Sequence, residues 1–309
     1  MSLTVKGFAS RGLVAGAAGG LAAGLFIRFV TERQIDVALR FEDAATLGGP
    51  SGGPAAVSRS TQQWGGVAAA VLYGAVLGVA LAVAVAALHH RVRARSEFDR
   101  VAKLAAAAFV AVVLVPGLKY PPNPPAVGDP DTIGERTRLY LSLMGTSVLI
   151  VFAAWVLWEN LTERGVLGAP RAMAVGAAFT LVVALAFVLW PPSPDTVAPP
   201  DNEAAPALRI ADDAPAPVLD AMLDTARSTR DDWIRDPGDP SEPLDLHAVD
   251  DPSDLAGAPG AVSTGELVPH SFTTAVWHFR LLTLAGLALM VSVMAAVLGL
   301  LLDLPSGAG

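Results

Sequence analysis

The chain has 309 residues and no cysteine. This absence excludes disulfides, thiolate metal sites and a cysteine nucleophile. Charged residues are also scarce, at 16% of the sequence, whereas soluble domains carry roughly 25%. Hydrophobic residues make up 53%, and this balance is typical of a membrane protein.

Sequence motifs that are typical of several enzyme classes and of nucleic-acid binding are missing as well. The sequence has no GxxxxGK[ST] loop, so no ATPase is built into the chain. It has no HExxH motif, no recognisable Ser-His-Asp arrangement and no acid pair in the middle of an apolar run, so we expect no enzyme and no permanently bound cofactor. Basic residues do not gather into the footprint that nucleic acids require, so we expect no nucleic-acid partner.

Six apolar runs are long enough to cross a bilayer, which takes about 20 residues. Lys6 and Arg11 precede the first run as in a signal peptide, but no small-residue cleavage site follows it, so we interpret it as a span. The sequence therefore predicts an all-α, polytopic membrane protein with about six transmembrane helices. The predicted spans are 12–30, 65–88, 102–118, 138–158, 171–190 and 279–302.

Basic residues in short loops predict the orientation in the membrane. The loop 89–103 carries Arg91, Arg93, Arg95, Arg100 and Lys103. We therefore expect a multi-pass protein of the inner (plasma) membrane with both termini in the cytoplasm. The segments 31–64, 119–137 and 191–278 would then lie outside.

Composition divides the chain into three parts. Residues 1–190 form a membrane domain with five spans, and 277–309 hold the sixth span and the C-terminus. Between them, 191–276 contains 17 of the 29 acidic residues and four of the 21 basic ones. Its proline, aspartate and alanine indicate a loose, acidic extracytoplasmic insert. One short helix is predicted there from the helical spacing of Leu219, Met222, Leu223 and Ala226.

Small residues recur every four positions in the first two spans, which places them on one helical face. The first set is Gly12, Gly16, Gly20 and Gly24, and the second is Gly66, Ala70, Gly74, Gly78 and Ala82. Such faces allow close approach of two helices in lipid. The pattern fits both static packing and two helices that slide during transport.

The loop 118–137, LKYPPNPPAVGDPDTIGERT, is the most unusual stretch of the chain. Its prolines predict an extended, stiff segment, and Pro116 with Gly117 predicts a weakened end of the third span. Thr132 and Glu135 match a capping box that would start the fourth helix. Asp129 and Asp131 fit two roles: they cap that helix, or they bind a cation together with Asn123.

Oxygen ligands suit hard and borderline divalent cations, and imidazole is the commonest ligand of transition metals. The predicted topology brings three outer segments to one face, and each holds such groups. A metal site is therefore predicted from Asn123, Asp129, Asp131, Glu42, Asp43 and His278. In the same region Glu32 and Asp36 share a helical face, and Asp36 could instead pair with Arg40.

The string LKYPPNPPAVGDPDTIGERTRLYL resembles the signature loop of the CbtA family of predicted cobalt transporter subunits. The segments 35–43, SRSTQQWGG at 58–66 and FTTAVWHFRLLTLAG are similar to that family too, so the resemblance covers most of 5–190 and 268–302. It implies a membrane subunit that supplies cobalt, as the transported ion, for cobalamin synthesis. It also implies a small, histidine-bearing, single-span partner of the CbtB type.

Two functions remain open from the sequence. The first is a subunit of a divalent-cation transporter, with cobalt as the leading substrate. The alternative is a non-transporting membrane scaffold or sensor, with the acidic insert as its binding surface. The lipid bilayer is a partner in both.

Overall fold

The computed structural model describes residues 5–36, 57–124, 132–194 and 272–304, with scattered residues between 216 and 255. Six helices in these ranges are long and apolar enough to cross a membrane, which confirms the prediction of an all-α polytopic protein. The six spans run Lys6–Asp36, Arg59–Leu88, Glu97–Lys119, Ile133–Glu163, Ala169–Leu189 and Val276–Asp303. Helices are expected here because lipid offers no partner for a free backbone N–H or C=O group.

Most helices extend beyond the predicted apolar runs, because polar turns at either end continue the helix outside the hydrocarbon layer. The third span, predicted over 102–118, begins five residues earlier, at Glu97. The fourth begins at Ile133 instead of 138. The elements are α1 (Val5–Phe26), η1 (Ile27–Thr31), α3 (Arg59–Leu88), α4 (Glu97–Phe109), η2 (Val110–Leu114), α5 (Val115–Lys119), α6 (Ile133–Glu163), α7 (Ala169–Leu189), η5 (Pro252–Leu255) and α9 (Phe272–Asp303).

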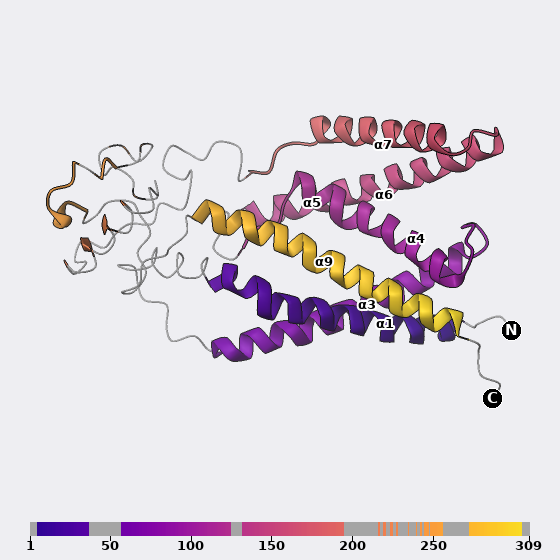
Figure 1. Ribbon diagram of the computed structural model, residues 1–309, viewed down its shortest axis with the longest axis horizontal. Coiled ribbons are helices and arrows are strands. Elements are labelled where there is room, and N and C mark those ends of the chain that lie inside the picture. Colours follow the sequence, from indigo (N-terminus) through magenta and orange to yellow (C-terminus); the bar gives the residue numbers. More distant parts are fainter. Residues whose placement is uncertain are drawn as a thin grey trace.

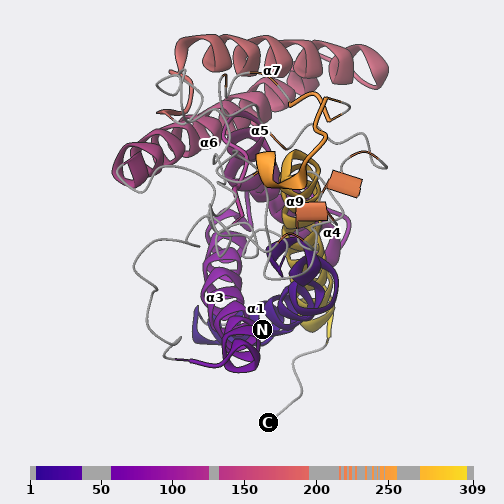
Figure 2. The ribbon, with the colours of Figure 1, turned by 90° about the vertical axis from the view of Figure 1, so that its left-hand side faces the viewer.

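The spanning helices run side by side along the long axis of the molecule (Figure 1). α1 packs against α3 and α9, and α9 packs in turn against α4. α6 contacts η2 and α5, and α7 packs mainly on α6. Viewed from the end that carries the insert, α6 and α7 lie on one side and α1, α3 and α9 on the other (Figure 2).

The tightest interface joins α1 and α3 through the predicted small-residue faces. A Cβ atom added at Gly16 would overlap the carbonyl oxygen of Gly74, and one at Gly12 would overlap that of Gly78. The two backbones therefore touch without intervening side chains, as small-xxx-small faces allow. Gly66 does not belong to this interface, because a Cβ atom there would meet nothing within 4 Å.

The main hydrophobic core lies where α1, α3, α4 and α9 meet. It includes Ala15, Val85, Val101, Met294 and Leu298, all buried. α7 contrasts with this core, since Leu181, Val188 and Leu189 are 71%, 81% and 67% exposed. Apolar side chains so exposed on a spanning helix are suited to lipid.

Two π-helical segments, η1 and η2, interrupt the first and third spans. Pro116 and Gly117, predicted to weaken the third span, lie inside a helix that continues to Lys119. Pro116 has no N–H group to donate to the carbonyl of Val112, four residues earlier. The hydroxyl of Tyr140 donates to that carbonyl instead, at 3.3 Å.

The starts of α3 and α4 and the end of α6 follow local capping chemistry, whereas the start of α6 does not. Ser58 and Ser96 have extended backbones, and their side chains accept from Thr61 N and Asp99 N at the starts of α3 and α4. The capping box predicted at Thr132 is wrong, because Thr132 has a helical backbone (φ −89°, ψ −4°) and makes no side-chain cap hydrogen bond. α6 ends in a Schellman motif: Val166 N donates to Leu161 O, Gly165 N donates to Thr162 O, and Gly165 has φ 76°.

Candidate functional site

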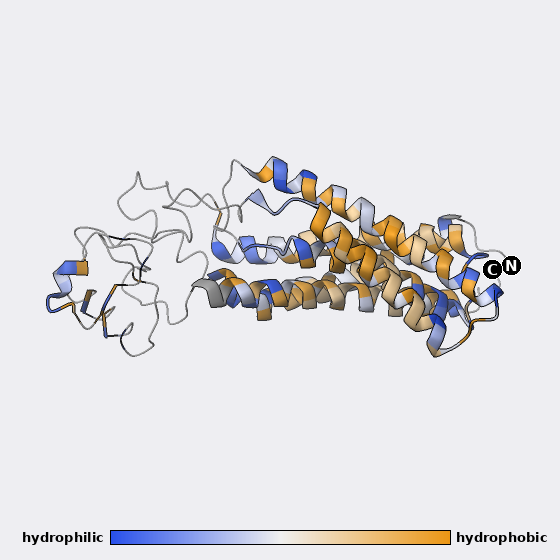
Figure 3. Cartoon of the chain, turned by 90° about the horizontal axis from the view of Figure 1, so that it is seen from above, coloured by the Kyte–Doolittle hydropathy of each residue, from blue (hydrophilic) through white to orange (hydrophobic). Residues whose placement is uncertain are grey.

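Polar residues gather at both ends of the spans, and the middle of the spans is mostly apolar (Figure 3). Proton relays and intramembrane catalytic sites usually place ionisable groups at mid-span, and such groups mark function wherever a membrane protein buries them. The candidate sites are therefore the two ends of the helices. The outer end is defined here as the end at which α1 finishes and α3 begins.

A polar cluster at the outer end joins α1 and α3. The guanidinium of Arg59 on α3 contacts Glu32 Oε1 and lies 2.9 Å from Asp36 Oδ1, both on the extension of α1. Gln63 Nε2 also donates to Glu32 Oε1, at 3.0 Å. Glu32 is almost fully buried, whereas Asp36 is half exposed. We call these four residues the outer polar cluster.

Among the described residues, the Asp36 carboxylate pairs with Arg59, which the sequence did not single out. Arg40 lies outside the described residues, so the alternative pair of Asp36 with Arg40 stays a prediction. Both carboxylates of the cluster already hold a cationic group. A divalent cation at this point would have to displace the guanidinium of Arg59.

The π-helical turn η1 lies next to this cluster and places two further polar groups. The guanidinium carbon of Arg28 lies 5.5 Å from the Phe29 ring centroid and 5.9 Å from that of Trp64 on α3, within the range of cation–π contacts. Thr31 is 2% exposed, and its hydroxyl has no hydrogen-bond partner among the described residues. A wider π turn at a polar helix end is often found at functional sites.

A second contact at the outer end joins the third and sixth spans. Arg280 Nη2 donates to Asn123 Oδ1 at 2.7 Å, across 157 residues of sequence. His278 is exposed two residues before Arg280 on α9. The structure therefore brings the Asn123 segment and the start of α9 together, as the predicted topology requires, and uses the Asn123 oxygen to hold a guanidinium.

The other predicted ligands lie outside the described residues. These are Asp129, Asp131, Glu42 and Asp43. Within the described ranges, no three His, Cys, Asp or Glu side chains lie close enough to hold a metal ion together. The six-residue metal site therefore stays a prediction.

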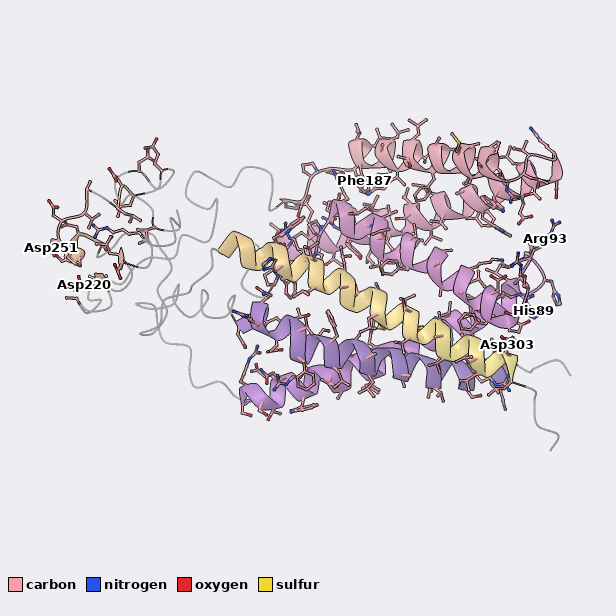
Figure 4. The ribbon with its side chains drawn as sticks, in the orientation of Figure 1. His89, Arg93, Phe187, Asp220, Asp251 and Asp303 are labelled. Carbon is pink, nitrogen blue, oxygen red and sulfur yellow. The ribbon has the colours of Figure 1, made fainter. Side chains whose placement is uncertain are left out.

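Side chains near Asn123 fix the third span against the fifth. Lys119 Nζ donates to the carbonyl of Phe187 at 2.9 Å, near the outer end of α7 (Figure 4). Tyr120 Oη donates to the carbonyl of Pro191 at 2.6 Å, and burial raises the pKa of this hydroxyl, so it stays a donor at neutral pH. The chain that enters the proline-rich loop is therefore anchored at its first residues.

A network of charged side chains lies at the inner end of the helices, where α3 finishes and α4 begins. Glu97 Oε1 accepts from Arg100 and lies 3.0 Å from His89 Nε2. Asp303, at the end of α9, accepts from the backbone N–H groups of Glu97 and Phe98 at 3.0 and 3.3 Å. The last turn of α9 thus caps the first turn of α4, and Figure 4 shows Asp303 and His89 at the same end of the molecule.

Residues 5–221, more than two thirds of the chain, match the model of the CbtA family, described as a probable cobalt transporter subunit. The match continues past residue 190 into the insert, further than the resemblance predicts, and it ends before 268–302. No curated protein and no solved structure matches the chain. The first five spans and the proline-rich loop between α5 and α6 all lie within the match, and the chain belongs to the CbtA family.

Proposed function

We propose that this chain is the membrane subunit through which a divalent cation, with cobalt as the leading substrate, enters the cell for cobalamin synthesis. The observation that carries the proposal is the family match over residues 5–221, which includes five of the six spans. The polar residues at the helix ends support it, because a transported ion needs ligands where it leaves water. The sequence has no GxxxxGK[ST] loop, so ATP hydrolysis is not built into this chain.

The proposed entry site consists of Asn123, Asp129, Asp131, Glu42, Asp43 and His278. The contact between Asn123 and Arg280 supports it, because it brings two of the three contributing segments together. The third contributing segment carries Glu42 and Asp43. It follows directly in the sequence after Asp36, a member of the outer polar cluster. Arg280 competes with the ion for the Asn123 oxygen, and this competition would keep binding weak enough for release.

The family description names a subunit, which implies a partner in a transporter complex. We propose that the partner is a small single-span protein of the CbtB type that supplies histidine ligands. The described part of this chain has few histidines of its own, and His89 is held by Glu97 and Arg100. The orientation proposed from the 89–103 loop places both termini in the cytoplasm and the entry site outside.

The test is uptake of radioactive cobalt and nickel by cells that express the chain, with and without Asp129→Ala plus Asp131→Ala. We expect the double variant to lose most of the uptake at equal expression. Asp220→Ala plus Asp224→Ala is a matched control, because it removes the same charge from the exposed side of a helix in the insert. Unchanged uptake in the first variant would remove the site from the proposal.

A second function, a scaffold or sensor, is supported by the insert. Several apolar residues there are almost fully buried, namely Leu219, Leu223, Ile234, Val249 and Leu255. Arg227 donates to the carbonyls of Leu246 and Val249 at 2.8 and 2.9 Å. Deleting 195–266 separates the two functions. A deletion variant that keeps its spans and its cobalt uptake, but no longer supports cobalamin synthesis in cells, favours the scaffold or sensor.

A further inference from the structure

The loop between α3 and α4, residues 89–96, carries an unusual concentration of positive charge. Residues 89–103 contain five lysines and arginines and two acidic residues. The loop joins two helices that are long enough to span a membrane, so it must lie at the depth of the lipid headgroups.

Side chains from α4 hold the backbone of this loop in place. Arg100 Nε donates to the carbonyl of Val92 at 3.4 Å, and Lys103 Nζ donates to that of Arg93 at 3.0 Å. The N–H group of Arg95 donates to Asp99 Oδ2 at 2.9 Å. Three of four consecutive residues are thus fixed, so the loop presents its side chains from a defined backbone.

The side chains alternate along this fixed backbone. Arg91, Arg93 and Arg95 are exposed, whereas Val92 and Ala94 between them are half-buried. Three guanidinium groups therefore face outward from five consecutive residues. Figure 4 shows Arg93 at the same end of the molecule as His89 and Asp303, level with the helix ends.

The positive charge of the three arginines is poorly neutralised within the described part of the chain. Arg93 Nη1 lies 4.0 Å from Glu159 Oε2, and its side chain remains 75% exposed. The neighbouring acids have other partners: Asp99 pairs with Lys103 at 2.8 Å, and Glu97 pairs with Arg100 and His89. Within the described ranges, Arg91 and Arg95 form no ion pair.

We propose that this loop binds the phosphates of anionic phospholipid headgroups. A guanidinium presents a planar pair of donors that matches two phosphate oxygens, which an ammonium group does not. Each basic residue near an anionic surface strengthens binding about fivefold, so the three together contribute on the order of 100-fold. The inference does not depend on which ion the protein carries or on which side of the membrane the loop lies.

The experiment uses the full chain purified in detergent. Its melting temperature is followed while phosphatidylglycerol, phosphatidylcholine or inorganic phosphate is added. The loop variant is Arg91→Gln, Arg93→Gln and Arg95→Gln together. A control variant carries Arg33→Gln and Arg138→Gln, two exposed arginines at the opposite end of the helices.

We expect phosphatidylglycerol to raise the melting temperature of the unmodified chain at far lower concentration than phosphatidylcholine. The loop variant should need about 100-fold more phosphatidylglycerol. The control variant should lose clearly less than the loop variant, because its two arginines lie on different helices and do not form one phosphate-binding surface. Loss of the response of the unmodified chain in 1 M salt supports the same conclusion without any substitution, since screening then acts within about 3 Å.

Two results would overturn the proposal. In the first, the loop variant responds to phosphatidylglycerol at the same concentration as the unmodified chain. In the second, inorganic phosphate stabilises the unmodified chain as well as the lipid does, which would identify a site for a soluble anion.

Discussion

Arg59 and Asp36 join the outer ends of α3 and α1 through a contact of 2.9 Å, and the same guanidinium holds the buried carboxylate of Glu32. One arginine therefore neutralises two carboxylates that come from the other helix. Removing Arg59 would therefore leave both carboxylates without this cationic partner.

Replacing Arg59 by Ala should destabilise the protein by about 2 kcal/mol, between the values for exposed and buried ion pairs, because Glu32 would stay buried without its partner. Millimolar Co²⁺ should restore part of this loss, since two free carboxylates offer oxygen ligands. Thermal unfolding of the purified variant, with and without Co²⁺, measures both effects. The double variant Arg59→Ala with Glu32→Gln is the control, and rescue of that variant by Co²⁺ would contradict binding at Glu32.

The α1–α3 interface predicts that replacing two different glycines by alanine changes the stability of the protein very differently. Gly16→Ala would force a methyl group against the Gly74 carbonyl, and we expect a loss of about 1–3 kcal/mol from overpacking. Gly66→Ala, on α3 with open space around it, should be neutral or stabilising by up to about 1 kcal/mol. Melting temperatures of the two variants compare them directly, and equal effects would argue against backbone contact at Gly16.

Asp303 should stabilise the protein by capping the first turn of α4. Asp303→Ala removes the acceptor for the N–H groups of Glu97 and Phe98 and should cost about 1 kcal/mol. Asp303→Asn keeps one acceptor oxygen and should lose less. Hydrogen exchange at the first turn of α4 is the measurement, and unchanged protection in the Ala variant would show that the cap is dispensable.

The contact between Asn123 and Arg280 predicts different results for stability and for transport. Asn123→Ala leaves the half-buried guanidinium of Arg280 without this acceptor, at a cost of about 1.5–3 kcal/mol. Asn123→Asp keeps an oxygen there and adds an attractive charge, so its stability should be at least that of the unmodified chain. If Asn123 also binds the ion, only the Ala variant should lose uptake. Equal loss in both variants would exclude this role.

Part of this fold could be read from the sequence. Apolar runs predicted six spans, and the four-residue spacing of Gly12, Gly16 and Gly20 predicted the face that packs on α3. These predictions were confirmed because a backbone in lipid must form helices, and because helices in lipid associate through close packing of small residues. The spacing did not show where the face ends, since Gly66 fits the repeat and contacts nothing within 4 Å.

The polar contacts were harder to predict. Asp36 pairs with Arg59 on another helix, because the packing of α1 on α3 brings their outer ends together. Asn123 and Arg280 meet only once the third and sixth spans are placed in space. Thr132 and Glu135 have the residue types of a capping box, but the box needs an extended N-cap backbone such as that of Ser58 (ψ 148°), and Thr132 has ψ −4°.

The central claim is that this chain carries a divalent cation across the membrane, with cobalt as its leading substrate. The most direct measurement is uptake of radioactive cobalt into cells that express the chain, alone and with a candidate single-span partner, against cells with an empty vector. The account predicts uptake that rises above the vector control, saturates with cobalt and falls in the Asp129→Ala plus Asp131→Ala variant. Uptake equal to the vector control, at confirmed membrane expression and with the partner present, would contradict it.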